Sequence, residues 1–250
     1  MAFHYSPKVV TDGLVLALDP SNLEKLGASP YNNLAGDGSI TNSNFATTES
    51  IFRSDCVNSA TGTSEFTFSG MEINTGSVTV QWFMNVTSNP NVDGNNNWRR
   101  LIAQTGGGRS PFGFVLEQSM YINFTLQTTT GSKRYLNSSF TPYNTSLNTW
   151  QMHTFTYNKS TGTSACYRND ILQRSGVQTT NGSGANATVA GEAMVNLSTS
   201  EVMGISNSNS SSGGDACLPA DLGYWLIYDK ALTLTEVQQN YNALKTRYGL

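Results

Sequence analysis

The sequence has little charge and few clustered basic residues. Only 12% of its 250 residues are charged, and the formal net charge is −3, whereas charged residues make up about a quarter of an average soluble domain. Basic residues are adjacent only at Arg99–Arg100 and Lys133–Arg134, and neighbouring residues of a strand point to opposite faces. Nucleic-acid binding needs a basic patch, so no nucleic-acid partner is expected.

Long apolar runs and paired cysteines are also missing. No stretch reaches the roughly 20 apolar residues that cross a bilayer, and MAFHYSPKVV has no apolar core of a signal peptide. The sequence therefore predicts no membrane partner and no such signal. Cys56, Cys166 and Cys217 form no CxxC pair, which argues against a zinc site and a disulfide framework. We interpret them as small buried residues of a protein made in a reducing cytoplasm.

Groups for catalysis are scarce. A retaining glycosidase needs two carboxyl groups about 5 Å apart, but Glu65 and Glu72 are seven positions apart and no carboxylates alternate along a predicted strand. Of the two histidines, His4 lies in the N-terminal segment and His153 in a strand pattern, where a buried structural role is expected. No P-loop or G-x-S-x-G pattern occurs. We predict no catalytic residue and no enzymatic activity.

In place of charge, the chain is rich in Ser, Thr, Asn and Gly, and 10% of its residues are aromatic. This composition is typical of short strands joined by polar turns. GLVLALD (13–19) and NTWQMHTFTYN (148–158) are clear strand patterns. Residues 64–73 and 77–86 are predicted to form a strand pair, and the alternation in 77–86 predicts a sheet with one buried face. The core is predicted to include the strand tryptophans, Trp82, Trp150 and Trp225.

The chain closes with one amphipathic helix, predicted over about residues 233–247. Thr233 and Glu236 form a capping box, and Gly249 follows as the stop. Such a helix is marginal alone, so we expect it to cover an edge or an apolar end of the sheet that contains LGYWLIYD. Its buried face is predicted from an apolar stripe at helical spacing, formed by Leu234, Val237, Tyr241, Leu244 and Tyr248.

No composition shift marks a linker, so residues 11–250 are predicted to form a single domain, preceded by an N-terminal arm of residues 1–10. Turn signals recur about every 8–12 residues, which favours a sandwich or jelly roll. Residues 21–63 are polar and rich in Gly and Asn, and they are expected to hold irregular loops and short strands.

Three segments resemble the concanavalin A-like lectin/glucanase superfamily, in particular its laminin G-like branch. They are TDGLVLALDP, the hairpin NTWQMHTFTYNKSTGTSACYRNDILQRSG, and DLGYWLIYDKALTLTEVQQNYNALKTRYG. The resemblance implies an all-β jelly-roll β-sandwich of two antiparallel sheets with a short C-terminal α-helix. SPKVVTDGLVLALDP and ALTLTEVQQNYNALKTRYG also resemble free-standing domains encoded by marine tailed phages, especially those of cyanobacteria.

This resemblance and the missing carboxylates lead to one hypothesis, a non-enzymatic accessory capsid or decoration protein. Such a protein would be synthesised in the bacterial host cytoplasm and located in the virion. Its partners would be major capsid or tail proteins and further copies of itself in a homo-oligomer. The alternative is a glycan-binding adhesin of a phage tail, neck or fibre that recognises host-surface carbohydrate. A secreted lectin-like module is a third interpretation, which the missing signal peptide disfavours.

Calcium is the one cofactor that the sequence leaves open. Asp93, Asn95 and Asn97 place oxygen ligands at alternate positions around a glycine, and calcium at the sandwich rim is a property of the family that the chain resembles. The distal glutamate of a calcium loop is missing, and the same residues are also typical of a plain Asn/Gly turn.

A sugar site needs aromatic rings and polar groups near loops. Trp98, Tyr143 and Tyr135 have this placement in the sequence, so they are the candidate glycan contacts. The alternative interpretation is that these rings pack partly against the sandwich rim.

Overall fold

The computed structural model describes residues 8–19, 31–32, 35, 39–43, 45–48, 51–54, 65–69, 75–88, 99–104, 112–116, 120, 122–127, 133–136, 145–177, 203–205 and 220–250. Their strands are β1 (Leu14–Leu18), β2 (Tyr31–Asn32), β3 (Ser39–Ser43), β4 (Phe45–Thr48), β5 (Ile51–Ser54), β6 (Glu65–Ser69), β7 (Val78–Val86), β8 (Arg99–Gln104), β9 (Phe112–Leu116), β10 (Ile122–Gln127), β11 (Lys133–Leu136), β12 (Gln151–Asn158), β13 (Thr163–Arg168), β14 (Ile171–Val177), β15 (Met203–Ile205) and β16 (Ala220–Tyr228). Helix α2 (Leu234–Leu244) continues directly into a 3-10 turn, η2 (Lys245–Tyr248).

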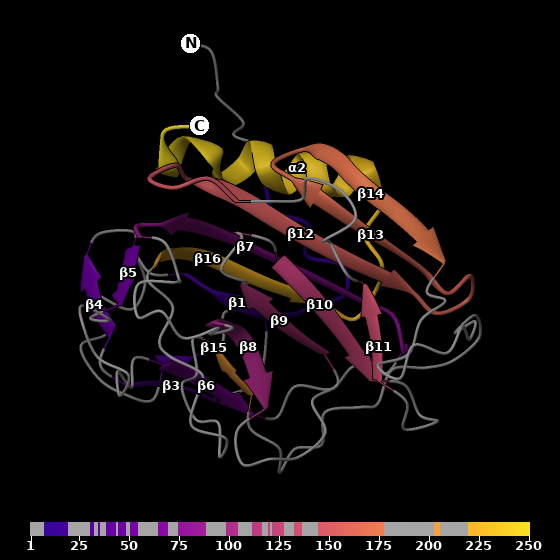
Figure 1. The fold of residues 1–250 in the computed structure, drawn as a ribbon, viewed down its shortest axis with the longest axis horizontal. Coiled ribbons are helices and arrows are strands. Elements are labelled where there is room, and N and C mark those ends of the chain that lie inside the picture. Colours follow the sequence, from indigo (N-terminus) through magenta and orange to yellow (C-terminus); the bar gives the residue numbers. More distant parts are fainter. Residues whose placement is uncertain are drawn as a thin grey trace.

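The strands form two sheets whose ladders are antiparallel in the part of the chain that the structure describes. Sheet A has the order β14-β13-β12-β7-β16-β5-β4, and β1 also pairs with β16. Sheet B has the order β11-β10-β9-β8-β15-β6-β3-β2. Figure 1 shows the two sheets stacked, with α2 on the far side of sheet A from sheet B. The predicted all-β sandwich with a closing helix is therefore confirmed.

A core of aliphatic and aromatic residues fills the space between the sheets. Trp82 of β7 and Trp225 of β16 are fully buried and stack with ring centroids 5.2 Å apart. Trp82 also meets Phe114 of β9, at 5.0 Å between ring centroids, so it joins the two sheets directly. Aromatic contacts of this geometry add about 0.5–1.5 kcal/mol beyond the buried area. The predicted core positions of Trp82 and Trp225 are confirmed.

Helix α2 covers a face of sheet A, which corrects two predictions. The helix was expected at a sheet edge or end, but Val237 and Leu244 pack with Tyr224 and Tyr228 on the outer face of β16. Since this face is covered, β7 is buried on both sides, and its polar residue Gln81 is only 1% exposed. The alternation along 77–86 therefore separates an apolar face from a mixed face that contains Thr79, Gln81 and Phe83, and these residues are buried as well.

The closing helix confirms the predicted capping box. Glu236 N donates to Thr233 Oγ1 at 3.3 Å, and Thr233 N donates to Glu236 Oε2 at 2.8 Å. The predicted stripe is only partly right, because Leu234 is 45% exposed whereas the polar residue Asn240 is fully buried. Leu234 is the first residue of α2, and at this end of the helix it lies beyond the sheet-facing residues. Gly249 ends the 3-10 turn in the left-handed conformation, with φ +70°.

The central hairpin also agrees with the sequence. Strands β12 and β13 pair from Asn158↔Thr163 to His153↔Arg168, and β13 continues into β14. Asn169, in the turn between β13 and β14, has φ +57°, a conformation that Asn adopts more readily than most residues. The expected strand pair 64–73 and 77–86 is wrong, because β6 belongs to sheet B and β7 to sheet A. The chain crosses between the layers here, as jelly-roll connections do.

Within the described ranges, no helix is long and apolar enough to cross a bilayer. Residues 1–7 of the predicted N-terminal arm lie outside these ranges, and the division into an arm and a single domain from residue 11 stays a prediction. Four short strands, β2 to β5, occur within residues 21–63, where the sequence predicted short strands among loops.

Candidate functional site

The residues that the sequence singled out for ligand binding lie mostly outside the described ranges. Asp93, Asn95, Asn97, Trp98 and Tyr143 all belong to this group, so their assignments stay predictions. In the part of the chain with described placement, no group of three His, Cys, Asp or Glu residues is arranged to hold a metal ion. This finding does not extend to the predicted calcium loop.

The remaining candidate glycan contact, Tyr135, lies in a strand and not in a loop. It belongs to β11, where it is paired with Thr125 of β10. Strand β11 is at one end of the strand order of sheet B. A residue on a terminal strand lies at an edge of its sheet, and the assignment of Tyr135 as a glycan contact stays a prediction.

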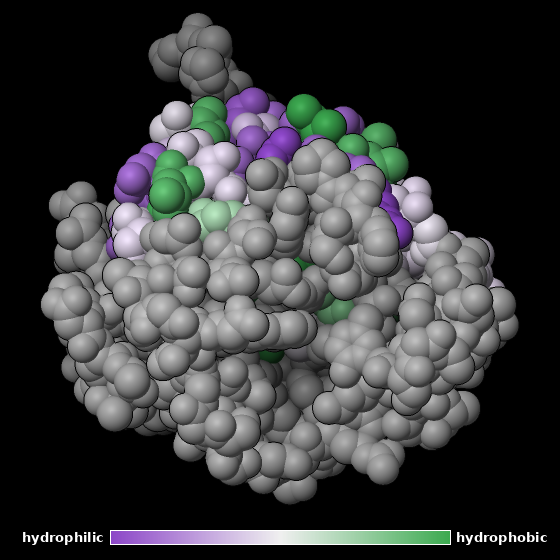
Figure 2. Space-filling view, viewed as in Figure 1, coloured by the Kyte–Doolittle hydropathy of each residue, from purple (hydrophilic) through white to green (hydrophobic). Residues whose placement is uncertain are grey.

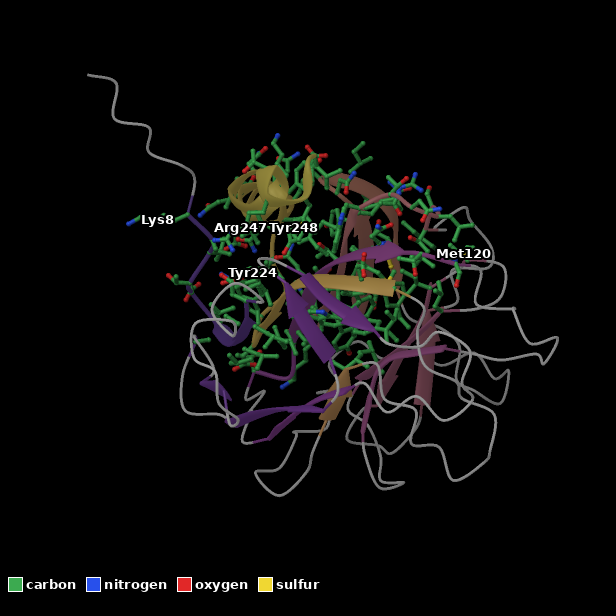
Figure 3. The ribbon with its side chains drawn as sticks, turned by 90° about the vertical axis from the view of Figure 1, so that its left-hand side faces the viewer. Lys8, Met120, Tyr224, Arg247 and Tyr248 are labelled. Carbon is green, nitrogen blue, oxygen red and sulfur yellow. The ribbon has the colours of Figure 1, made fainter. Side chains whose placement is uncertain are left out.

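A cluster at the end of the closing helix combines charge with an aromatic ring. Arg247 Nη1 donates to Asp19 Oδ2 at 2.9 Å, and the guanidinium lies 5.7 Å from the ring centroid of Tyr224. The Asp19 side chain is 7% exposed and that of Arg247 is 40% exposed. The carboxylate at the end of β1 thus holds a guanidinium that still reaches solvent. Figure 3 shows Arg247 and Tyr248 above Tyr224 at this side of the molecule.

Burial and charge shape the electrostatics of this cluster. Burial raises the pKa of Tyr224 to about 12, the Asp19 carboxylate adds to the increase, and the Arg247 guanidinium opposes it. Tyr224 therefore stays a neutral phenol at neutral pH. Together these groups form a hydrogen-bonding edge beside apolar rings, and they include no nucleophile with an adjacent base. Sequence reasoning did not find the cluster, because Asp19 appeared only as the end of a strand.

Tyr248 fixes the helix end onto the sheet. Its ring stacks on Phe83, with centroids 4.4 Å apart, and contacts Trp150 at 4.7 Å. Its hydroxyl accepts a hydrogen bond from Tyr224 N at 2.8 Å. Trp150 is therefore part of the helix-side packing and is only partly buried, so its predicted core position is only partly right. It is the described tryptophan with a partly accessible ring.

A buried polar network lies beneath the middle of α2. Asn240 Nδ2 donates to Gln81 Oε1 and, at 2.9 Å, to Tyr228 Oη. Gln81 Nε2 donates in turn to Thr154 Oγ1 at 2.9 Å. The network ties the helix to three strands of sheet A, β7, β12 and β16. Each of these polar groups has a partner, as buried polar groups require.

His153 has the buried position expected of a structural residue. It is fully buried and stacks on Trp82 at 5.5 Å between ring centroids. Burial, and to a smaller extent the positive charge of Arg168, lowers its pKa to about 3. His153 is therefore neutral in the folded protein at pH 7 and remains so well below pH 6.

This lowered pKa predicts that stability falls on mild acidification. An unfolded histidine takes up a proton below about pH 6.5, whereas folded His153 stays neutral down to about pH 3. His153 should thus reduce the free energy of unfolding by about 1.4 kcal/mol per pH unit below pH 6.5. Urea unfolding from pH 7 to 4.5 measures this slope. The variant His153→Gln should have a shallower slope by that amount, and an equal slope would contradict the assignment.

The exposed apolar residues of the described surface do not form one patch. Figure 2 shows polar and apolar residues interspersed around α2. Ile171 and Leu172, 63% and 46% exposed, lie on the edge strand β14. The register of this strand shifts beside Leu172, and Gln173 Nε2 donates to Ile171 O at 3.2 Å. A bulge and a self-capped carbonyl protect an edge against strand pairing.

Comparisons with known proteins agree with the fold. No protein-family model and no curated protein matches the chain. Its structure is similar to the binding domain of botulinum neurotoxin serotype D, with a TM-score of 0.61 and 13% identity over 93% of this chain and 52% of that one. A structure of the receptor binding domain of botulinum neurotoxin D gives a TM-score of 0.59 and 13% identity, over 92% of this chain and 52% of the other.

The binding domain of Paraclostridial Mosquitocidal Protein 1 is similar to the same degree. Its TM-score is 0.60 at 14% identity, over 93% of this chain and 52% of that one. The chain thus spans about half the length of the solved structures that it matches. At this identity the likeness concerns the fold alone, and the fold is the lectin-like jelly-roll β-sandwich.

Proposed function

We propose that the protein is a non-enzymatic recognition module of a phage particle that binds carbohydrate on the host cell surface. The observation that carries the proposal is the likeness over 93% of the chain to the binding domain of a neurotoxin. One such neighbour is described as a receptor binding domain. Because one fold supports many functions, this likeness supports the proposal and a binding assay decides it.

The composition of the chain supports a neutral polar ligand. Only 12% of the residues are charged, and sugars are recognised by aromatic rings together with neutral polar groups. The predicted contacts are Trp98, Tyr143 and Tyr135, with calcium held by Asp93, Asn95 and Asn97 as an optional organiser of the same loops. The absence of an alternating carboxylate cluster in the sequence supports a binding role over glycoside hydrolysis.

The proposal that the protein belongs to a phage particle rests on the resemblance of SPKVVTDGLVLALDP and ALTLTEVQQNYNALKTRYG to domains encoded by tailed phages. The same resemblance is compatible with an accessory capsid or decoration protein. The number of copies per particle distinguishes this role from that of an adhesin. Quantitative mass spectrometry of purified particles would show a few to a few tens of copies for a tail, neck or fibre adhesin. A simple ratio to the major capsid protein would support decoration, and absence from particles would contradict both locations.

Carbohydrate recognition is tested by a glycan array with the purified chain. We expect binding to a limited set of glycans, and Trp98→Ala should weaken it about tenfold, since an aromatic anchor contributes more than about 1 kcal/mol. Tyr241→Ala, on α2 and not among the predicted contacts, is the control and should bind normally. If no glycan binds, or if Trp98→Ala binds like the control, the proposed site is wrong. A loss of binding after calcium chelation would support the calcium loop.

A further inference from the structure

The N-terminal clip, residues 8–12, is held by Asn240 of α2 and Tyr228 of β16, a site called the groove below, and it is not a strand of either sheet. Val10 N donates to Asn240 Oδ1 at 2.7 Å, and Val10 O accepts from Tyr228 Oη at 3.1 Å. The Val10 side chain is 8% exposed and packs with the helix-side core. Both main-chain groups of one residue are therefore bound by buried side chains.

The groove recognises the clip mainly through its backbone. Gln239 Nε2 donates to Lys8 O at 2.7 Å, so three hydrogen bonds reach main-chain atoms within three residues. Lys8 is exposed, and Figure 3 shows its side chain pointing away from the molecule. Such contacts require an extended peptide with an apolar residue at the central position, and they do not depend on which chain supplies it.

The groove contains hydrogen-bonding side chains that the clip satisfies. Asn240 and Tyr228 are fully buried, and without the clip Asn240 Oδ1 would lose its partner Val10 N. The vacated groove would present this acceptor and the Tyr228 hydroxyl to another segment of the same chemistry.

The clip is attached to the sandwich through a short turn. Asp229 N donates to Gly13 O at 2.7 Å, and Gly13 has φ +73°. Asp12 pairs with Lys230 at 2.6 Å, next to the groove. The clip thus begins next to Gly13, whose carbonyl is held by Asp229. A rotation at Gly13 would release the clip without disturbing β1.

We propose that the groove also accepts the clip of a second copy of this chain, so that neighbouring copies exchange clips. A second copy supplies the same backbone groups, the same Val10 side chain and the same Asp12 charge for Lys230, so every contact of the intramolecular arrangement is reproduced. Exchange of an identical element costs little free energy and links copies without new surface chemistry. This proposal is independent of carbohydrate binding.

Disulfide trapping between two full-length chains tests the exchange. One chain carries Lys8→Cys and the other Gln239→Cys, both with Cys56→Ser and Cys217→Ser to remove competing thiols. Cys166 is buried, and burial raises its pKa, which keeps it unreactive. After mixing at high protein concentration under mild oxidation, we expect a disulfide-linked heterodimer, measured by mass spectrometry of tags of different mass.

The matched control replaces the acceptor with Thr246→Cys, an exposed position of η2. We expect at least about fivefold less heterodimer with this control. Val10→Pro in the Lys8→Cys chain removes the N–H donor to Asn240, and it should also lower the yield about fivefold or more. Equal yields from Gln239→Cys and Thr246→Cys, or no effect of Val10→Pro, would overturn the proposal. Circular dichroism of each chain confirms that a low yield does not come from misfolding.

Discussion

Replacing Gly223 by valine is expected to lower the free energy of unfolding by about 3 kcal/mol, the upper part of the range for overpacked cores. A Cβ at this position of β16 would lie 2.6 Å from Cζ and Oη of Tyr248. The tyrosine ring cannot swing aside, because Phe83 stacks on it at 4.4 Å and Trp150 contacts it at 4.7 Å. Displacing the ring would also break the hydrogen bond from Tyr224 N.

Urea unfolding monitored by tryptophan fluorescence measures this loss. The matched control is Gly176→Val in β14, where an added Cβ meets nothing within 4 Å. This substitution should change the free energy of unfolding by less than about 0.5 kcal/mol, since valine suits an open strand position. Equal stabilities of the two variants would show that Tyr248 does not fix α2 to the sheet.

The second large effect is expected for Asn240→Ala, which should cost about 3 kcal/mol or more. The substitution removes the partners of Gln81 Oε1 and Val10 N, and it takes away one donor to Tyr228 Oη. Each buried group left unpaired costs about 1–3 kcal/mol. Because Asn240 also holds the N-terminal clip, a protease should cleave the variant near Val10 faster than it cleaves the parent chain.

Asn242→Ala is the control for this prediction. Asn242 lies on the same helix but is exposed, and alanine has the higher helix propensity. Its variant should be as stable as the parent chain or slightly more stable. Thermal unfolding compares the stabilities of the two variants. Limited proteolysis of the folded proteins, in a separate experiment, compares how fast each is cleaved near Val10. An Asn240→Ala protein that unfolds like Asn242→Ala would contradict a stabilising role for the network.

The fold could be predicted where the sequence has a local signal. The capping box at Thr233 and Glu236 and the β12–β13 hairpin each depend on neighbouring residues, and the structure confirms them. The alternation along β7 correctly indicated a strand, but it did not reveal that both faces of the strand are buried. The position of α2 on a face of sheet A could not be predicted in this way. It depends on long-range contacts between the helix and β16, which no local periodicity specifies.

The candidate site was less accessible to sequence reasoning. Asn240 is not part of the predicted apolar stripe, and asparagine is usually a surface residue, yet Asn240 is fully buried. One signal was present in the alternation of β7: Thr79 and Gln81 occupy the face opposite Trp82, and uncharged polar residues on a central strand can be covered by a helix that supplies hydrogen bonds. Asp19 gave no such signal, because its partner Arg247 lies 228 positions away.

The position of α2 gives the molecule two unlike sides. Lys8 is held by Gln239 of α2, and Leu250 N donates to Lys245 O at 3.1 Å, so both of these residues lie beside the helix. Figure 1 shows sheet B on the opposite side. A linker, tag or carrier joined at either residue would therefore hold the molecule by its helical side, leaving sheet B to face outward. Immobilised through these positions, the protein would present one defined surface to its surroundings.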